Sequence, residues 1–415
     1  MSLSRVAGNV GDFAWVRLIF TDLAGATRAV QIPGDAFEKA LRDGVRVDGS
    51  ALEGRNRLIE TDLVLRPDPT TLCASSARVA RVVCDIFDYE GNPWPLDPRQ
   101  TLRQMVESTS VASSGWTGAA ELEWYLVRSD LMPVDSEGYF SYARGQGEQL
   151  LERTAAELQG LNVSLTGAHH EAGPGQYEVN VAASTPMALA DTLMNARTVI
   201  ADMAHAEGLI ATFMARPLND LPGSGMHIHQ VLRNANDDDM ERIERIVAGI
   251  LHHGPALCAF SAPTINSYRR LHRGAEAPSY ATWAHSSRAA LVRVSPTDGD
   301  AISVEYRGSD SSANPYLVIA ALLAAAEIGL ADELKLPAPL EESVEGVGLA
   351  QVETAPTQLP RSLEQAITQL LGDEELIDCF DDRLIGRYAE DLMAEVEASQ
   401  GYVSEWERQR YLQNF

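Results

Sequence analysis

Three segments that read as short β-strands each carry two polar side chains spaced two residues apart. Successive side chains of a strand point to opposite faces, so each pair projects from one face. Carboxylates that point the same way repel one another unless cations neutralise them. A fold that brings these strands together therefore has to supply positive charge. The segments are residues 120–126 with Glu121 and Glu123, residues 226–229 with His227 and His229, and residues 304–307 with Glu305 and Arg307.

A fourth segment, residues 169–178, places Glu171 and Glu178 on either side of a Gly-Pro-Gly turn. A single pair of this kind is more often part of a solvated strand face. The inference of a metal site therefore rests on the occurrence of several such pairs in one chain. Carboxylate oxygens with one imidazole are ligands for two hard divalent ions, Mg²⁺ or Mn²⁺. The set contains no thiol, which argues against structural zinc. The candidate ligands are Glu121, Glu123, Glu171, Glu178, His227 and Glu305.

Four arginines accompany these segments: Arg270, Arg288, Arg293 and Arg307. Each alone is more often a surface cation. Together with metal ions, however, guanidinium groups provide what phosphoryl transfer requires, because charge spreads over the transferred oxygens. Glu276 lies in a loop that either closes over a site or turns at the surface.

The charge balance excludes several classes of protein. The chain has 33 Lys and Arg against 59 Asp and Glu, a net charge of −26, which repels nucleic acids and anionic membranes. Lys39 and Lys335 are the only lysines, and neither lies in a Gly-rich phosphate loop. The longest apolar stretch, residues 316–326, is too short to span a bilayer. Four scattered cysteines fit a reducing compartment, and we predict a cytoplasmic globular protein.

The chain length of 415 residues fits two domains. Residues 13–20 and 28–32 predict a β-hairpin, and helical patterning begins after residues 96–98. We therefore expect an N-terminal domain over residues 1–96 and a second domain over 97–415.

Helix signals follow in the second part. Thr185 and Gly208 bracket one apolar-periodic stretch, and a second apolar helix runs from Asn314-Pro315 to about Leu330. Residues 333–361 read as a Pro-rich loop. Ser362 and Gln365 form a capping-box pattern that starts a C-terminal helical segment.

The ordered motifs resemble those of the glutamine synthetase family, of the bacterial type I lineage, over about residues 13–330. Beside the segments above they include residues 47–50, 62–69, 223–229, 266–278 and 313–317. The resemblance implies an α+β fold with a small N-terminal β-grasp domain. A larger catalytic α/β domain follows, with a curved antiparallel sheet and flanking helices. It also implies a homododecamer of two hexameric rings with active sites between subunits.

The resemblance also implies roles for individual residues. One metal takes Glu123, Glu171 and Glu178, and the other takes Glu121, His227 and Glu305. Other residues bind the substrates or act in catalysis: Arg270, Arg307 and Gly223 for the amino acid, Arg288 and Arg293 for phosphoryl transfer, Glu276 as the flap, His229 and Arg293 for the nucleotide, and Asp48 from a neighbouring subunit with Tyr139 for the amine.

The implied reaction uses ATP to convert glutamate to γ-glutamyl phosphate, from which an amine displaces phosphate. The substrates are a small acid and a small amine. We expect an organic amine, with ammonia, and thus glutamine synthesis, as the close alternative. A non-catalytic homologue with impaired nucleotide binding is a third possibility. Three departures from the family pattern motivate it: Ser303 replaces an arginine, Asp300 a basic residue and Val231 a serine. A fourth departure, Pro222 in place of an asparagine, borders the amino-acid pocket and leaves a non-glutamate acid open.

Overall fold

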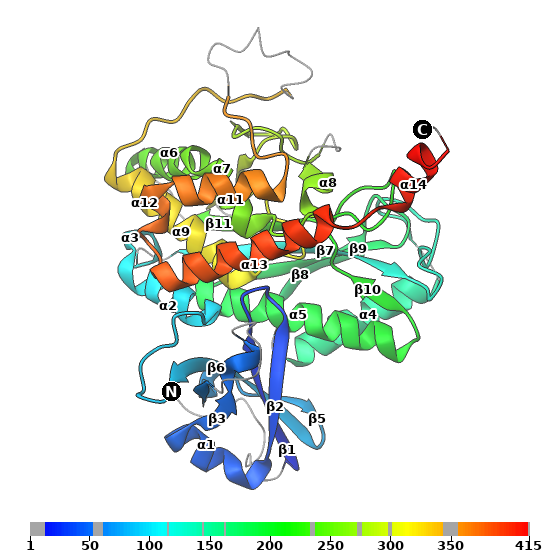
Figure 1. The fold of residues 1–415 in the computed structure, drawn as a ribbon, viewed down its shortest axis with the longest axis vertical. Helices are drawn as coiled ribbons and strands as arrows, with labels where there is room; N and C mark the ends of the chain where they lie inside the picture. Colours follow the sequence, from blue (N-terminus) through cyan, green and yellow to red (C-terminus); the bar gives the residue numbers. More distant parts are fainter. Residues whose placement is uncertain are drawn as a thin grey trace.

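The structure is a computed structural model in which two β-sheets build two stacked parts (Figure 1). The smaller, N-terminal sheet lies below the larger part in this view, and most helices surround the larger sheet. The described residues are 13–52, 61–113, 116–142, 145–161, 163–232, 237–271, 276–297, 301–342 and 356–413.

The N-terminal sheet has the strand order β2-β1-β6-β4-β3, with β5 paired to β6. β1 and β6 are parallel and the other pairs are antiparallel. The predicted hairpin is confirmed as β1 and β2, joined through a turn in which Gly25 adopts a φ of 80°. The strands are β1 (Trp15–Thr21), β2 (Thr27–Pro33), β3 (Val45–Asp48), β4 (Asp62–Pro67), β5 (Cys73–Ser76) and β6 (Val79–Asp88).

Helix α1 (Phe37–Asp43) contributes Phe37 to a separate apolar core that includes Leu18 and Leu65. The described residues of this part also form three single-turn 3₁₀ helices: η2 (Gly34–Ala36), η3 (Gly49–Ala51) and η4 (Pro69–Thr71).

The larger sheet has the order β12-β13-β14-β11-β7-β9-β8, with β10 paired to β7. All pairs are antiparallel except β12 with β13. The polar strands of the sequence are therefore neighbours. The strands are β7 (Thr117–Val127), β8 (Leu165–His170), β9 (Gln176–Ser184), β10 (Ile210–Thr212), β11 (Met226–Leu232), β12 (Trp283–Ala284), β13 (Val292–Thr297) and β14 (Ala301–Tyr306).

The helices of the larger part pack around this sheet (Figure 1). They are α2 (Pro98–Ser108), α3 (Ser110–Ser113), α4 (Gln146–Gly160), α5 (Pro186–Ala206), α6 (Asp237–His252), α7 (Gly254–Ser261), α8 (Ser267–Leu271), α9 (Pro315–Ala331), α11 (Leu363–Gly372), α12 (Glu374–Ile377), α13 (Asp382–Gln400) and α14 (Glu405–Tyr411).

The predicted helix starts are confirmed at α5, α9 and α11, whose N-caps are Thr185, Asn314 and Ser362. The capping box at α11 is half formed. Ser362 accepts from the Gln365 N–H, but the Gln365 side chain accepts from the Arg361 N–H at 2.8 Å, one residue further back. The described residues of the Pro-rich loop, 333–342 and 356–361, contain no helix or strand, and residues 343–355 lie outside the described part.

Helix α9 is buried along most of its length and forms the centre of the main core. Among the described residues, no helix combines the length and apolar character needed to cross a membrane. All four cysteines are unpaired, and three of them are buried. Burial raises the pKa of Cys258 to about 12, so it is a packing group and not a nucleophile.

Arg99 joins the two parts of the molecule through three carboxylates. Its guanidinium lies 2.8 Å from Asp68 and 2.5 Å from Asp85, both in the N-terminal part. It also donates twice to Asp191 of α5, at 2.9 Å each. The side chain is 3% exposed, so these ion pairs are largely screened from solvent.

Replacing Arg99 with Met should destabilise the protein by about 3–5 kcal/mol, because buried Asp191 and half-buried Asp68 and Asp85 lose their common partner. Urea unfolding measures this loss. Arg103→Met is the matched control, since Arg103 is a third exposed and shares only Asp85 at close range. Equal unfolding midpoints for the two variants would contradict the role given to Arg99.

Candidate active site

The strand register brings one acidic group together from three strands. Glu121 of β7 lies opposite His227 of β11, and Glu305 of β14 lies opposite His229. The His227 Nδ1 atom is 2.8 Å from a Glu121 oxygen and 3.5 Å from a Glu305 oxygen. One ligand atom from each of Glu121, His227 and Glu305 lies within 4.8 Å of the others. We call these three residues the first group.

Two arginines neutralise the first group. Glu305 is buried, and its oxygens lie 2.5 Å from Arg307 and 2.6 Å from Arg293. Burial opposes ionisation of Glu305, but the charge of Arg307 outweighs it, and the pKa is lowered. The close approach of Arg293 lacks the alignment of a hydrogen bond, so one Glu305 oxygen has ion-pair contact only.

A second group forms where β8 and β9 meet the Gly-Pro-Gly turn. His169, Glu171 and Glu178 place ligand atoms within 4.8 Å of one another, and His169 Nε2 lies 3.4 Å from Glu178. We call these three residues the second group. His169 was not among the predicted ligands, although it lies two residues before Glu171 and pairs with Glu178 in the sheet.

Glu123 lies directly opposite Glu178 in the register, but its carboxylate points elsewhere. It accepts from the Gly225 N–H at 2.9 Å and from the Gln176 amide at 3.2 Å. Glu123 is therefore beside the second group and outside the cluster of three ligand atoms. Its assignment as a metal ligand stays a prediction.

Among the described residues, the second group has no arginine partners like those that neutralise Glu305 in the first group. Burial raises the pKa of Glu171 to about 7, and the Glu178 charge adds to the shift. Burial, followed by repulsion from Glu178 and Glu171, also holds the pKa of Glu123 well above its usual value. Among the described residues, no arginine forms an ion pair with these three carboxylates. Buried, mutually repelling carboxylates of this kind fit a divalent cation, which would favour their ionised forms.

A cavity of about 400 Å³ connects the two groups. Members of both groups line it, together with the four predicted substrate and flap residues Gly223, Arg270, Glu276 and Arg307. Its remaining lining residues are Glu123, Gln176, Arg216, Asp220, Leu221, Pro222 and Ala277.

Contacts with the backbone and with His227 hold Arg270 at the cavity. Arg270 is buried and donates to the Arg307 carbonyl at 3.1 Å, and one of its nitrogens lies 3.3 Å from His227. Gly223 allows the close approach, because a Cβ atom there would lie 2.6 Å from the Ala215 oxygen and 2.7 Å from Arg270. The predicted amino-acid-binding residues are thus brought to one wall.

The predicted flap lies at the rim. Arg288 donates to the Glu276 carboxylate at 3.1 Å and also hydrogen-bonds the Tyr139 hydroxyl. Arg307 donates to the backbone oxygens of Glu276 and Arg288 at 3.2 and 3.1 Å. The side chains of Glu276 and Arg288 are both exposed, so the contact between them can rearrange when a substrate binds.

Comparisons with known proteins decide the family. The glutamine synthetase catalytic-domain model matches residues 95–411, and the glutamine synthetase β-grasp-domain model matches residues 12–89. The chain belongs to the glutamine synthetase family. The predicted fold class is confirmed, and the protein is an ATP-dependent ligase of the glutamine synthetase type.

Relatives cover almost the whole chain. Glutamine synthetase of Thermotoga maritima is 34% identical, over 96% of each chain, and that of Halobacterium salinarum is 32% identical, over 97% of this chain and 94% of its own. Two solved structures share the fold at 24% identity. "Apo GmaS without ligand" has a TM-score of 0.85 over 97% of each chain. "GmaS/ADP complex-Conformation 1" has 0.84 over 98% of this chain and 100% of its own.

Two of the four departures from the family pattern lie side by side in the larger sheet. Val231 and Ser303 lie directly opposite each other on β11 and β14. The Ser303 hydroxyl hydrogen-bonds His229 Nδ1 at 3.0 Å, and the other His229 nitrogen lies 3.3 Å from Glu121. Pro222 lines the cavity. Asp300 lies outside the described residues.

One predicted site residue lies away from the cavity of its own chain. Asp48 ends β3 of the N-terminal sheet, where its carboxylate accepts from the Ser50 N–H at 2.9 Å. All described residues that line the cavity come from the larger part. The role of Asp48 therefore depends on a neighbouring subunit and stays a prediction.

Asp135 is a positioning residue that the sequence did not indicate. Its carboxylate accepts from the Gly175 N–H at 2.8 Å and the Tyr177 hydroxyl at 2.6 Å, and lies 3.1 Å from His170 Nε2. It thus fixes both sides of the turn that carries the second group. Burial opposes ionisation, but the hydrogen bonds lower the pKa of Asp135 to about 2.

We expect Glu305→Gln, which keeps the side-chain volume, to remove one divalent ion per chain and to reduce amide formation at least a hundredfold. The amide cannot supply a charged ligand, and it releases Arg293 and Arg307 from their partner. Equilibrium dialysis with Mn²⁺ counts the ions. Ser303→Ala, on the same strand, should leave the count unchanged. A Glu305→Gln enzyme that keeps two ions and full activity would remove Glu305 from the metal site.

Asp135→Asn should lower stability at pH 7 by an amount on the order of 1 kcal/mol. The folded-state pKa lies below the usual 3.8, so ionised Asp135 stabilises the wild type above about pH 4, and this contribution is lost as the pH falls toward 2. The variant should therefore show a flatter pH dependence of the unfolding free energy between pH 4 and 2. Urea unfolding across this range tests it, with the exposed Asp35→Asn as control.

Proposed function

We propose that this glutamine synthetase family member joins glutamate to an organic amine. The product is a γ-glutamyl amide, formed through a γ-glutamyl phosphate with ATP as phosphoryl donor. The carboxyl group of glutamate is a poor electrophile, and phosphorylation divides one difficult displacement into two easier ones. A structure of the same fold titled as an ADP complex supports nucleotide use.

The two acidic groups support binding of two divalent ions, Mg²⁺ or Mn²⁺. Glu121, His227 and Glu305 would hold one ion. Glu171, Glu178 and either His169 or Glu123 would hold the other. Such ions neutralise charge on phosphoryl oxygens.

The chain's own residues perform the remaining tasks. Arg270 and Arg307 would bind the carboxylate of the amino acid at the cavity wall, where Gly223 leaves room. Arg288 and Arg293 would stabilise the negative charge of the transferred phosphoryl group. Glu276 would close the rim and exclude water, which otherwise hydrolyses the acyl phosphate. His229 lies toward the nucleotide end.

An aromatic pair beside the second group carries the preference for an organic amine. The rings of Tyr139 and Phe140 lie 4.0 Å apart, and both meet the His169 ring edge-on. Phe140 adopts a φ of 58°, an uncommon conformation for a bulky residue, and its N–H donates to the His170 carbonyl at 3.1 Å. Strained, exposed aromatic faces suit the alkyl part and the cationic form of an organic amine.

Glutamine synthesis from ammonia is the second candidate. The relatives from Thermotoga maritima and Halobacterium salinarum carry that name, and Asp48 matches the acid of the family's ammonium site. In either case the proton of the amine leaves before attack, and we propose that Asp48 of a neighbouring subunit accepts it.

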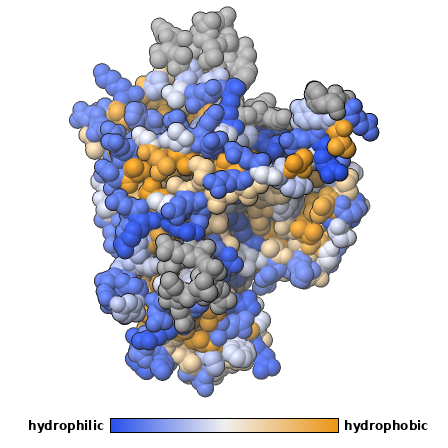
Figure 2. Space-filling model, viewed as in Figure 1, coloured by the Kyte–Doolittle hydropathy of each residue, from blue (hydrophilic) through white to orange (hydrophobic). Residues whose placement is uncertain are grey.

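We also propose a ring assembly, up to a homododecamer, with active sites between subunits. The C-terminal segment extends from the body of the chain at α14 (Figure 1). It exposes a set of large apolar or aromatic side chains. Figure 2 shows further hydrophobic residues across the middle of the same face. Surfaces of this kind are typical of protein interfaces. The C-terminal set is Tyr402, Val403, Trp406, Tyr411 and Leu412. We place the protein in the cytoplasm, where reducing conditions suit free cysteines.

Phosphate release with Mg²⁺, ATP and glutamate should be at least ten times more efficient, as kcat/KM, with a small alkylamine than with ammonia. The panel contains ammonia, methylamine, ethylamine, ethanolamine, a polyamine and an aromatic amine. Phe140→Ala should reduce kcat/KM for the alkylamine about tenfold and change the value for ammonia less, because the lost contact is with the alkyl group. Leu131→Ala, also exposed with a positive φ, is the control. A preference for ammonia would establish the second candidate instead.

A further inference from the structure

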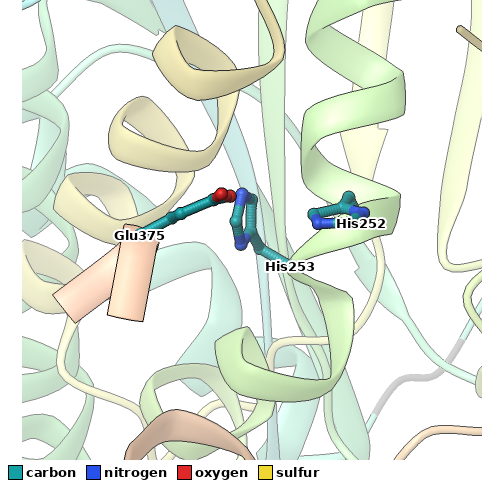
Figure 3. Close-up of side chains that lie close together, drawn as sticks. All are labelled: His252, His253 and Glu375. Carbon is teal, nitrogen blue, oxygen red and sulfur yellow. The ribbon is translucent and has the colours of Figure 1, made fainter. Parts of the chain in front are cut away.

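A third cluster of metal-binding side chains lies outside the cavity, where α6 and α7 meet α12. It consists of His252, His253 and Glu375, whose ligand atoms lie within 4.8 Å of one another. Figure 3 shows the two imidazole rings side by side, with the Glu375 carboxylate directed at the His253 ring. None of the three lines the 400 Å³ cavity.

His253 is held in the orientation of a metal ligand. It is 1% exposed, and its Nδ1 lies 2.8 Å from an oxygen of Asp373. The other Asp373 oxygen accepts from the Leu376 N–H at 3.2 Å and so caps α12. The Asp373 carboxylate can only accept at Nδ1 when ionised, and it therefore favours the tautomer that carries the proton on Nδ1.

This arrangement leaves the second nitrogen of His253 without a partner. His253 Nε2 is buried and makes no hydrogen bond. With the proton on Nδ1, Nε2 carries a lone pair, and a buried acceptor without a partner destabilises the folded state. A carboxylate that fixes one imidazole nitrogen while the other faces further ligands is the usual arrangement around metal-bound histidines.

We propose that His252, His253 and Glu375 form a binding site for a divalent transition-metal ion of the Zn²⁺ type. Two imidazole nitrogens and one carboxylate oxygen are the ligand set of zinc sites with an open fourth position. The catalytic groups differ in that carboxylates dominate them, which favours Mg²⁺ or Mn²⁺.

The geometry requires a modest adjustment. Bonds of 2.0–2.2 Å around a tetrahedral ion place ligand atoms about 3.4 Å apart, so no separation has to shorten by more than about 1.4 Å. His252 and Glu375 are exposed and can close this distance by side-chain rotation. His252 also lines a separate cavity of about 270 Å³, with Trp283 and Lys335, which gives an ion access from solvent.

An ion at this site would tie the junction of α6 and α7 to α12, more than a hundred residues away in the chain. Binding to the folded state alone stabilises that state in proportion to the logarithm of ion concentration over Kd. The site is therefore expected to raise thermal stability without entering the ligase reaction.

Zinc titration of the metal-stripped full-length protein tests the proposal, with excess Mg²⁺ present to occupy the catalytic groups. Calorimetry and metal analysis after dialysis count the ions. The His252→Ala, Glu375→Gln double variant keeps buried His253 intact and should bind one Zn²⁺ fewer per chain than the wild type, or bind it at least a hundredfold more weakly. Zn²⁺ should raise the melting temperature of the wild type but not that of this double variant.

The matched control is the His205→Ala, Glu374→Gln double variant, which replaces one exposed histidine and one exposed glutamate outside the cluster. It should bind Zn²⁺ as the wild type does. Glu305→Gln should also keep this ion, which separates it from the catalytic metals. Equal ion counts in the wild type and in the His252→Ala, Glu375→Gln variant would overturn the proposal. So would the loss of all bound Zn²⁺ in the Glu305→Gln variant, because the ion would then lie in the first group.

Discussion

The structure depends on how a buried sheet accommodates carboxylates that share one face. Antiparallel register across β14, β11, β7 and β9 brings Glu121, Glu305 and Glu178 into the interior of one molecule, where their charges are poorly screened. The two acidic groups solve this differently. Glu305 has two arginines, whereas Glu171 and Glu123 have raised pKa values.

This difference has a consequence for substrate binding. The Glu305 oxygens that hold Arg293 and Arg307 are the atoms that a divalent ion would use. Ion binding at the first group and release of these guanidinium groups toward the cavity are therefore coupled by geometry. At the second group, ion binding instead competes with protons, since Glu171 titrates near pH 7.

The sequence predicted the elements that local chemistry determines. Alternating polar residues predicted β7, β11 and β14, and side-chain caps predicted the starts of α5, α9 and α11. Grouping of Glu121, His227 and Glu305 followed from motifs whose strands are neighbours. Local spacing could not predict which way a side chain turns. The Glu123 carboxylate turns to accept from the Gly225 N–H, and the Gln365 side chain turns to accept from the Arg361 N–H. Asp135 was missed because its partners lie 35 or more residues away and are joined only by folding.

The same electrostatics bears on the departures near the nucleotide end. A chain of net charge −26 repels a triphosphate, and the family's arginine is replaced there by Ser303, whose hydroxyl only orients His229. The remaining positive charge at that end includes Arg293, which Glu305 partly neutralises. Attraction of ATP must then come chiefly from divalent ions held by the acidic groups. Nucleotide affinity should accordingly depend on metal binding more steeply than in a relative that keeps the arginine, because the protein's own charge there is smaller.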